Sequence, residues 1–150
     1  MVKKSPTAAQ HDAKVGSGTG QGTQVRCMES YRQGVGRWGE ERALHHVVEM
    51  GWEVLARNWR RGRLEVDILA RDGPWLVVIE VKTRSEPVQA GWHRIVSRAQ
   101  QERLIRAARA FLAQHPERGL EVRFDVLAVL RNRYGHRILH TRDAFYPLLR

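Results

Sequence analysis

The chain has 150 residues, a formal net charge of +10 and one cysteine. This length predicts one domain of ordinary size, and a single cysteine excludes an intrachain disulfide framework. The apolar runs are far shorter than the roughly 18 residues of a membrane span, and the N-terminus lacks the apolar segment of a secretory signal. We therefore expect a cytoplasmic protein with no membrane association. Its positive charge favours a polyanionic partner such as nucleic acid, although a solvated basic face explains the charge equally well.

The first 33 residues are poor in large apolar side chains and include a low-complexity stretch, Gly16–Thr23. Such a composition predicts flexibility. We therefore expect a disordered, basic N-terminal extension at residues 1–33 and a folded domain at residues 34–150. The extension holds five basic and two acidic residues, a net of +3, so +7 of the +10 belongs to the folded part.

The first regular element that we expect is a helix that begins between Val35 and Trp38 and ends at Gly51. Its apolar residues recur at spacings of three and four, which is typical of a helix with one buried side: Ala43, Leu44, Val47 and Met50. Glu40 lies in the first turn, where a carboxylate is favourable because of the helix dipole. On position alone, this structural role is favoured over a role in a site.

Residues 52–59 predict a first strand that runs into a basic loop ending at residue 63. Two apolar, β-branched runs at residues 63–71 and 75–83 flank an Asp-Gly-Pro turn and predict a hairpin. A second helix is expected at residues 97–114, with an apolar side formed by Leu104, Ala108, Phe111 and Leu112.

The last elements expected are a strand at residues 121–130, a short strand near 137–140 and one helical turn at 143–146. The order of helix, three strands, helix and one or two strands indicates an α/β fold. It contains an antiparallel hairpin and a helical crossover that adds a parallel strand.

Charged residues stand at corresponding positions of the two hairpin strands. Side chains alternate along a strand, so Glu65 shares a face with Asp67, and Glu80 shares a face with Lys82. Burying an unpaired charge is costly, so these groups need a partner. If the hairpin pairs through its Asp-Gly turn, the carboxylates of Asp67 and Glu80 converge. They could then bind a hard cation such as Mg²⁺, or Mn²⁺, through oxygen ligands.

Three further groups would complete such a site. The backbone carbonyl of Val81 would add a ligand. Lys82 would orient or help to deprotonate an attacking water, or stabilise charge on a phosphate. Glu40, from the first helix, would add a ligand or hold a water. Together these groups describe metal-assisted hydrolysis of a phosphodiester.

The alternative is an ion-pair ladder on a solvated strand face. In that arrangement Glu80 pairs with Lys82 or Arg84, and Asp67 pairs with Arg63. However, the face that carries Glu80 begins apolar and becomes charged only at its end, as a site at a sheet edge would. The spacing therefore favours the site slightly over the ladder.

The motif formed by Asp67, twelve intervening residues and Glu80-Val81-Lys82 resembles the D…(D/E)xK core of restriction-endonuclease-like nucleases. An ordered set of stretches also resembles the YraN-like family of bacterial proteins, an uncharacterised group assigned to that fold: Gly39–Ala43, Gly51–Arg60, Glu65–Gly73, Val78–Arg84 and Arg123–Val126. The similarity spans about residues 34–146.

This resemblance implies a restriction-endonuclease-like fold, a central mixed β-sheet flanked by helices with an αβββαβ core. It implies site positions at Glu40, Asp67, Glu80 and Lys82. The arrangement is also similar to archaeal Holliday-junction resolvases, which cut branched DNA. That substrate is an analogy at the level of the fold.

Two positions depart from the family pattern. Leu64 stands where a glycine usually precedes the equivalent of Glu65, so Glu65 remains a secondary site candidate. Gln100 stands where a lysine is expected in the second helix. Gln100 is still able to contact a phosphate or a water.

The basic loop interleaves arginines with Trp59. These side chains could grip phosphates while the indole stacks on a base, or the loop could be solvated with Trp59 anchored in the core. The candidates for nucleic-acid contacts are Arg57, Arg60, Arg61, Arg63, Arg84 and Gln100. The histidines show no metal-ligand spacing and are expected on the surface or in packing. Asp125 is expected to pair with a nearby arginine.

The leading hypothesis is a Mg²⁺- or Mn²⁺-dependent nuclease that hydrolyses DNA, branched or structured DNA if its role is resolvase-like. Such a role would suit a homodimer with two-fold symmetry. The alternative is a nucleic-acid-binding module with a nuclease fold and no catalysis. A third hypothesis is an interaction protein whose basic surface meets an acidic partner.

Overall fold

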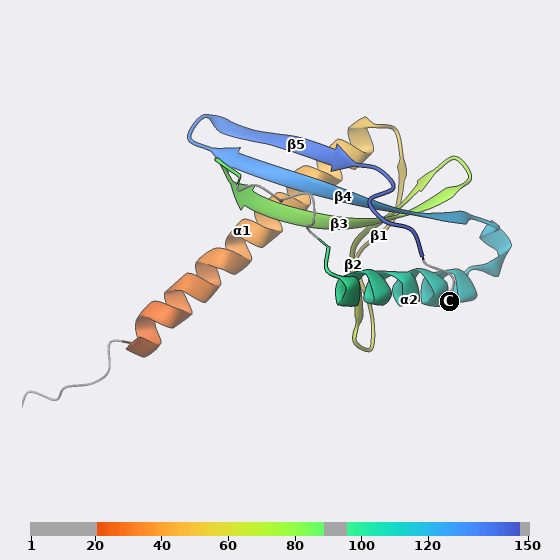
Figure 1. The fold of residues 1–150 in the computed structure, drawn as a ribbon, viewed down its shortest axis with the longest axis horizontal. Helices are drawn as coiled ribbons and strands as arrows, with labels where there is room; N and C mark the ends of the chain where they lie inside the picture. The colour runs from red at the N-terminus through yellow and green to blue at the C-terminus, as the bar shows by residue number, and fades with distance from the viewer. Residues whose placement is uncertain (1–20, 89–95, 148–150) are drawn as a thin grey trace, which may run out of the picture.

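The computed structural model describes residues 21–88 and 96–147 (Figure 1). A five-stranded mixed sheet lies between two helices, so the expected α/β class is confirmed. In chain order the elements are α1 (Gln21–Glu49), β1 (Glu53–Arg61), β2 (Leu64–Asp72), β3 (Trp75–Ser85), α2 (Arg98–Gln114), a 3₁₀ turn (Pro116–Arg118), β4 (Glu121–Asn132) and β5 (Gly135–Thr141).

The strands lie in the sheet in the order in which they occur in the chain. Neighbouring strands pair antiparallel at β1–β2, β2–β3 and β4–β5, whereas β3 and β4 pair parallel over their length. Because parallel strands need a crossover connection, α2 joins β3 to β4, as the sequence predicts. The hairpin, the crossover helix and the last two strands are therefore confirmed.

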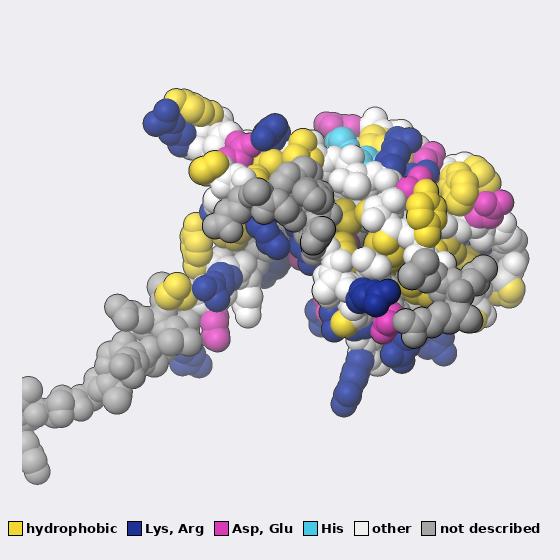
Figure 2. Space-filling view, in the orientation of Figure 1, with side chains coloured by type: hydrophobic (Ala, Val, Ile, Leu, Met, Phe, Trp, Pro, Cys, Tyr) yellow, Lys and Arg dark blue, Asp and Glu magenta, His cyan; other side chains and the backbone are white. Residues whose placement is uncertain are grey.

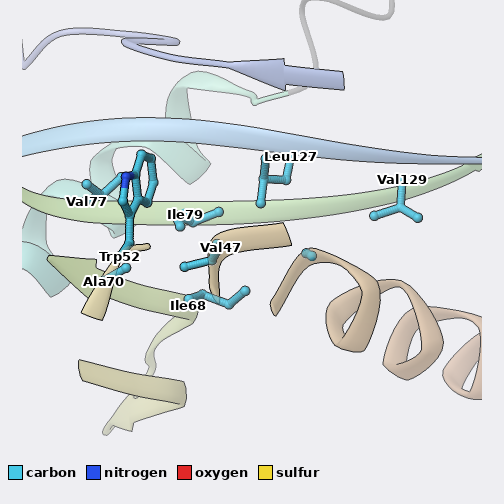
Figure 3. Packing of buried hydrophobic residues seen from close by; sticks show 9 residues of the cluster. Val47, Trp52, Ile68, Ala70, Val77, Ile79, Leu127 and Val129 are labelled. Atoms are coloured by element: carbon cyan, nitrogen blue, oxygen red, sulfur yellow. The ribbon is translucent and has the colours of Figure 1, made fainter. Parts of the chain in front are cut away.

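Each face of the sheet is covered by one helix. On the α1 face, Val47 and Trp52 pack with Ile79, Leu127 and neighbouring apolar residues (Figure 3). On the α2 face, a second cluster joins the helix to the strands: Leu104, Ala107, Ala108 and Phe111 with Val66, Leu69, Leu76, Val78 and Phe124. Burial on both faces explains why β3 is an almost continuous apolar run before Glu80.

The first helix is longer than the sequence predicts. It begins at Gln21, so the expectation of disorder is wrong for residues 21–33, and α1 runs without a break across the expected boundary at residue 33. Extending an existing helix adds one hydrogen bond for each residue fixed, and this segment is rich in good helix formers and has no proline. Residues 1–20 of the expected extension lie outside the described residues.

The expected helical turn at residues 143–146 is also wrong. A turn at residues 142–143 is followed by irregular backbone up to residue 147. The amide of Ala144 donates to the carbonyl of Phe124 at 2.8 Å, and the ring of Phe145 stacks on Phe124 with centroids 4.7 Å apart. Packing against β4 therefore fixes this segment, and the amide of Ala144 bonds to β4 instead of to a helical carbonyl.

None of the helices in the described part of the chain is long and apolar enough to cross a membrane.

Candidate active site

The candidate site lies where the two hairpin strands separate. β2 and β3 pair from Asp72↔Trp75 to Ile68↔Ile79 and no further. Beyond that point β2 continues beside β1 towards Leu64, whereas β3 continues beside β4 to Ser85. The two strands therefore form a fork, and Asp67 stands at its apex next to Ile68.

The carboxylate of Asp67 bridges the fork. Its Oδ2 accepts a hydrogen bond from the backbone amide of Val81 at 2.7 Å. Here β3 has lost β2 as its partner, and an unpaired buried amide would be costly. Asp67 satisfies this amide with its side chain, and the bond fixes the carboxylate beside Glu80 and Val81.

Glu80 is buried beside Asp67, with 8% of its surface exposed. Its Oε1 accepts a hydrogen bond from the ammonium of Lys82 at 2.5 Å and another from the side-chain amide of Gln100. Gln100 lies in the first turn of α2, which Ser97 caps by accepting from the amide of Gln100 at 3.3 Å. The start of α2 thus delivers a side chain to the fork.

Negative charge is crowded at Asp67. Its pKa is raised from 3.8 to about 7, because burial disfavours the ionised form and Glu80 and Glu40 repel it. The amide of Val81 and the ammonium of Lys82 oppose this rise without cancelling it. Glu40, in the first helix, is therefore close enough to Asp67 to help raise its pKa.

A close approach of α1 to β3 positions Glu40. A Cβ at Gly39 would lie 1.8 Å from Oγ1 of Thr83, so only glycine permits this contact. Glu40 follows directly in the helix and is half-buried. The family resemblance implied that Glu40 is a site residue. The close packing at Gly39 explains how α1 can hold Glu40 near β3.

The fork opens into a cavity of about 390 Å³ on the α2 side. Its lining combines carboxylates with two arginines, and it consists of Arg63, Glu65, Asp67, Glu80, Gln100, Arg103 and Leu104. Carboxylates that could hold a cation therefore face the same space as guanidinium groups that could hold a phosphate.

Residues 39–129 match the sequence model described as "Uncharacterised protein family UPF0102". The chain belongs to the UPF0102 family. A UPF0102 protein of Parafrankia sp. (strain EAN1pec) is 45% identical over 114 residues, which is 75% of this chain and 97% of that protein. UPF0102 proteins of Beutenbergia cavernae and Christiangramia forsetii are 43% and 37% identical, over 74% and 75% of this chain and 95% and 93% of their own.

The segment matched to the UPF0102 family contains all the residues brought together at the fork: Glu40, Asp67, Glu80, Val81, Lys82 and Gln100. It excludes the α1 residues before Gly39 and all of β5. The candidate site therefore lies within the segment that matches the family.

The surface-ladder alternative accounts for one contact only. Lys82 does pair with Glu80, but both side chains are largely buried, and Gln100 shares the same carboxylate oxygen. Asp67 uses the amide of Val81, and the described contacts include no Asp67–Arg63 ion pair. A solvated ladder does not describe this arrangement.

The expected basic loop is wrong for residues 57–61, which belong to β1 and pair with β2, and its arginines make different contacts. Arg60 pairs with Glu65 at 2.6 Å, and the guanidinium of Arg61 donates to the carbonyl of Ala110 at 3.3 Å. Arg63 lines the cavity, while Arg57 and Arg84 are exposed. Trp59 packs edge-on against Phe111 with centroids 6.2 Å apart, which supports its role as a core anchor.

Glu65 and Arg103 both line the cavity at the fork. Glu65 lines the cavity, but it is exposed and paired with Arg60. Arg103 also lines the cavity, one helical turn after Gln100. The spacing of three residues between Gln100 and Arg103 was the signal available in the sequence.

A buried polar network occupies the other face of the sheet. Asp125 pairs with Arg123 at 3.0 Å, as expected, and Arg123 also pairs with Asp72 at 3.0 Å. His140 adds a contact to Asp125 at 2.8 Å, which its sequence context did not indicate. Arg123 lies over the ring of Trp52, 5.0 Å from the centroid. This network belongs to the packing under α1 rather than to the fork.

Proposed function

We propose that this protein is a metal-dependent nuclease that hydrolyses DNA phosphodiester bonds at the fork between β2 and β3. The observation that carries this proposal is the convergence of Asp67 and Glu80 on one polar cavity with two arginines on its wall, where Lys82 donates a hydrogen bond to Glu80. Structural ion pairs do not need such a cavity, whereas a phosphate substrate does.

The donor set fits a hard divalent cation. Asp67 and Glu80 each use one carboxylate oxygen in the bonds described above, so each keeps a second oxygen for a cation. With the carbonyl of Val81 they provide the all-oxygen ligands that Mg²⁺ and Mn²⁺ accept. When bound, such a cation supplies charge that stabilises the phosphate and acidifies a water. The carboxylate repulsion at Asp67 would be relieved by that positive charge.

The remaining residues have distinct roles in this proposal. Lys82 lies within hydrogen-bond reach of Glu80 and would orient the attacking water or stabilise the charge that develops on the phosphate. Arg63 and Arg103 would hold the phosphate oxygens from the cavity wall. Glu40 would support the site from α1, and Gln100 fixes the orientation of Glu80.

One observation favours a second candidate, a nucleic-acid-binding module without catalysis. Within residues 21–88 and 96–147, no three His, Cys, Asp or Glu side chains are grouped closely enough to hold a metal. A site with two carboxylates depends on backbone and substrate oxygens for the rest of its ligands. The net charge of +10 suits nucleic-acid binding in either case.

Cleavage assays distinguish the two candidates. Linear, flapped and four-way DNA are each incubated with Mg²⁺ and with Mn²⁺, using the wild type, Asp67→Asn and Lys82→Ala. Glu102→Gln, an exposed carboxylate change on α2, is the matched control. Cutting by the wild type and the control, but by neither site variant, supports the nuclease. Salt-dependent binding without metal-stimulated cleavage on any substrate supports the binding module.

A further inference from the structure

A groove lies on the α1 side of the molecule, away from the cavity at the fork. Its volume is about 720 Å³. One wall is formed by α1, with Tyr31, Val35 and Trp38. The other wall is formed by the end of β3, by the end of β4 with Arg131, and by the β4–β5 turn with Arg133.

The two walls stand out from the body of the protein. The N-terminal half of α1 extends beyond the sheet, and the β4–β5 hairpin projects past the other strands (Figure 1). Hydrophobic and basic side chains occur together on the hairpin end and on α1 (Figure 2). Most of the groove residues lie before residue 39 or after residue 129, outside the segment matched to the UPF0102 family.

Aromatic rings and arginines occur together in this groove and in an adjoining pocket, which shares Glu86, Asn132 and Arg133 with the groove and is also lined by Tyr134. Tyr31 is 63% exposed and Tyr134 is 82% exposed. Arg131 lies over the ring of Tyr31 and donates to its hydroxyl at 3.2 Å, and Arg133 lies 4.7 Å from the centroid of the Tyr134 ring. Exposed rings beside guanidinium groups are the elements that bind unpaired bases and their phosphates.

The charge of the groove favours a polyanion over a second copy of the chain. The acid in its lining, Glu86, accepts hydrogen bonds from Asn132 and from Arg137, both at 2.6 Å. Its negative charge is thus matched within the protein, while Arg133 remains exposed. A two-fold contact through this groove would bring the arginines of both copies together, which is unfavourable.

We propose that this groove and the adjoining pocket bind a single-stranded segment of the nucleic acid, with its bases on Tyr31 and Tyr134 and its phosphates on Arg131 and Arg133. The identity of the ligand rests on the proposed function. A duplex hides its bases within the stack, so single strands use such rings better. Ser85, in the groove lining, follows Glu80 by five positions along β3, a rise of about 16 Å. That distance corresponds to about five nucleotides at a stacked spacing.

The test measures binding without cleavage. Fluorescence anisotropy in EDTA compares a labelled oligothymidylate with a duplex of equal length, using the full chain. The double variant Arg133→Ala/Tyr134→Ala changes two exposed turn residues, and Tyr31→Ala tests the opposite wall. Arg71→Gln is the control, because it removes one exposed arginine beside the β2–β3 turn, at the opposite end of β3 from the groove. We expect roughly tenfold weaker single-strand binding for the double variant and for Tyr31→Ala, with little change for Arg71→Gln or for the duplex.

Three results would overturn the proposal that this groove binds single strands. The variants could bind single strands as the wild type does, or Arg71→Gln could weaken binding as much as the groove variants. Sedimentation could also show a wild-type dimer that the double variant converts to a monomer with unchanged binding. The assay is made in EDTA and measures binding alone, so a wild type that fails to cleave leaves this test intact. Conversely, if the groove variants bind single strands normally, cleavage that depends on Asp67 would still support the proposed nuclease.

Discussion

The carboxylate of Asp67 accepts a hydrogen bond from the backbone amide of Val81 at 2.7 Å, across the point where β2 and β3 part. A side chain thereby replaces the ladder bond that a paired strand would have made. The replacement stabilises the fork through its hydrogen bond but places a half-buried negative charge beside Glu80. At the fork, the hydrogen bond from Val81 to Asp67 is therefore opposed by repulsion between the carboxylates of Asp67 and Glu80.

Asp67→Asn should stabilise the metal-free protein at alkaline pH. The folded state holds the Asp67 proton with a pKa of about 7, against an ordinary value of 3.8, so ionisation penalises folding increasingly between about pH 4 and pH 7. Asparagine removes that charge and can still accept from Val81. In EDTA at about pH 8, urea unfolding should show a gain of up to about 4 kcal/mol, which disappears near pH 4.

Two comparisons make this prediction specific. Asp67→Ala removes the charge and the hydrogen bond together, so its gain should be smaller by about 1–3 kcal/mol because the amide of Val81 is left unpaired. Mg²⁺ should stabilise the wild type and not Asp67→Asn. A loss of stability for Asp67→Asn that is equal at both pH values would contradict the charge argument.

The sequence predicts the fork residues because strand alternation and hairpin register are local rules. They place Asp67 opposite Glu80 without knowledge of the rest of the chain. The bond from Gln100 to Glu80 depends on how α2 docks on the sheet, and no local pattern specifies that. The same limit applies to His140, which reaches Asp125 only because β5 pairs with β4. The start of α1 was missed because residues 21–33 hold few large apolar side chains, so little in the local sequence indicates a buried helix.

Asp125→Asn should have the opposite effect to Asp67→Asn. Burial opposes ionisation of Asp125, but the bonds from His140 and Arg123 outweigh it and hold its pKa below the ordinary value. Its ionised form therefore stabilises the fold above that ordinary value, and this contribution is lost as the pH falls through the lowered pKa. At about pH 7 we expect a loss of about 3 kcal/mol, because Arg123 keeps its charge with fewer partners.

Urea unfolding at neutral pH measures this loss. Asp143→Asn is the matched control, since Asp143 is exposed and contributes its backbone amide to the same network. Asparagine also tolerates the positive φ of 48° at that position. Equal stability of Asp125→Asn and the control would show that the network contributes nothing.

Gly39→Ala should disrupt the contact between α1 and β3. The added Cβ would lie 1.8 Å from Oγ1 and 3.0 Å from Cβ of Thr83, so the helix or the strand must shift. Overpacking of this kind costs about 1–3 kcal/mol. Gly34→Ala and Gly36→Ala, in the same helix with nothing within 4 Å of the new Cβ, should be neutral or slightly stabilising.

A double variant identifies the clash as the cause. Thr83→Ala removes the atom nearest to the new Cβ, so Gly39→Ala/Thr83→Ala should recover part of the loss in a double-mutant cycle. Strictly additive losses would mean that Gly39 acts through something other than Thr83.

Lys82→Ala should separate metal binding from catalysis, given the proposed nuclease activity. Lys82 is a cation beside Glu80, at 2.5 Å, so its removal takes away a competitor for that carboxylate and leaves Gln100 to orient it. The affinity for Mn²⁺, followed by calorimetric titration, should stay the same or rise, whereas Asp67→Asn should lose it. Loss of a group that assists the water or the phosphate lowers kcat by about 10²–10³-fold.

Arg84→Ala is the control for Lys82→Ala. It removes an exposed charge two residues along the same strand, and it should raise KM with little effect on kcat. A kcat for Lys82→Ala equal to that of the wild type would exclude Lys82 from the chemistry, and weaker Mn²⁺ binding would mean that it holds the site together instead.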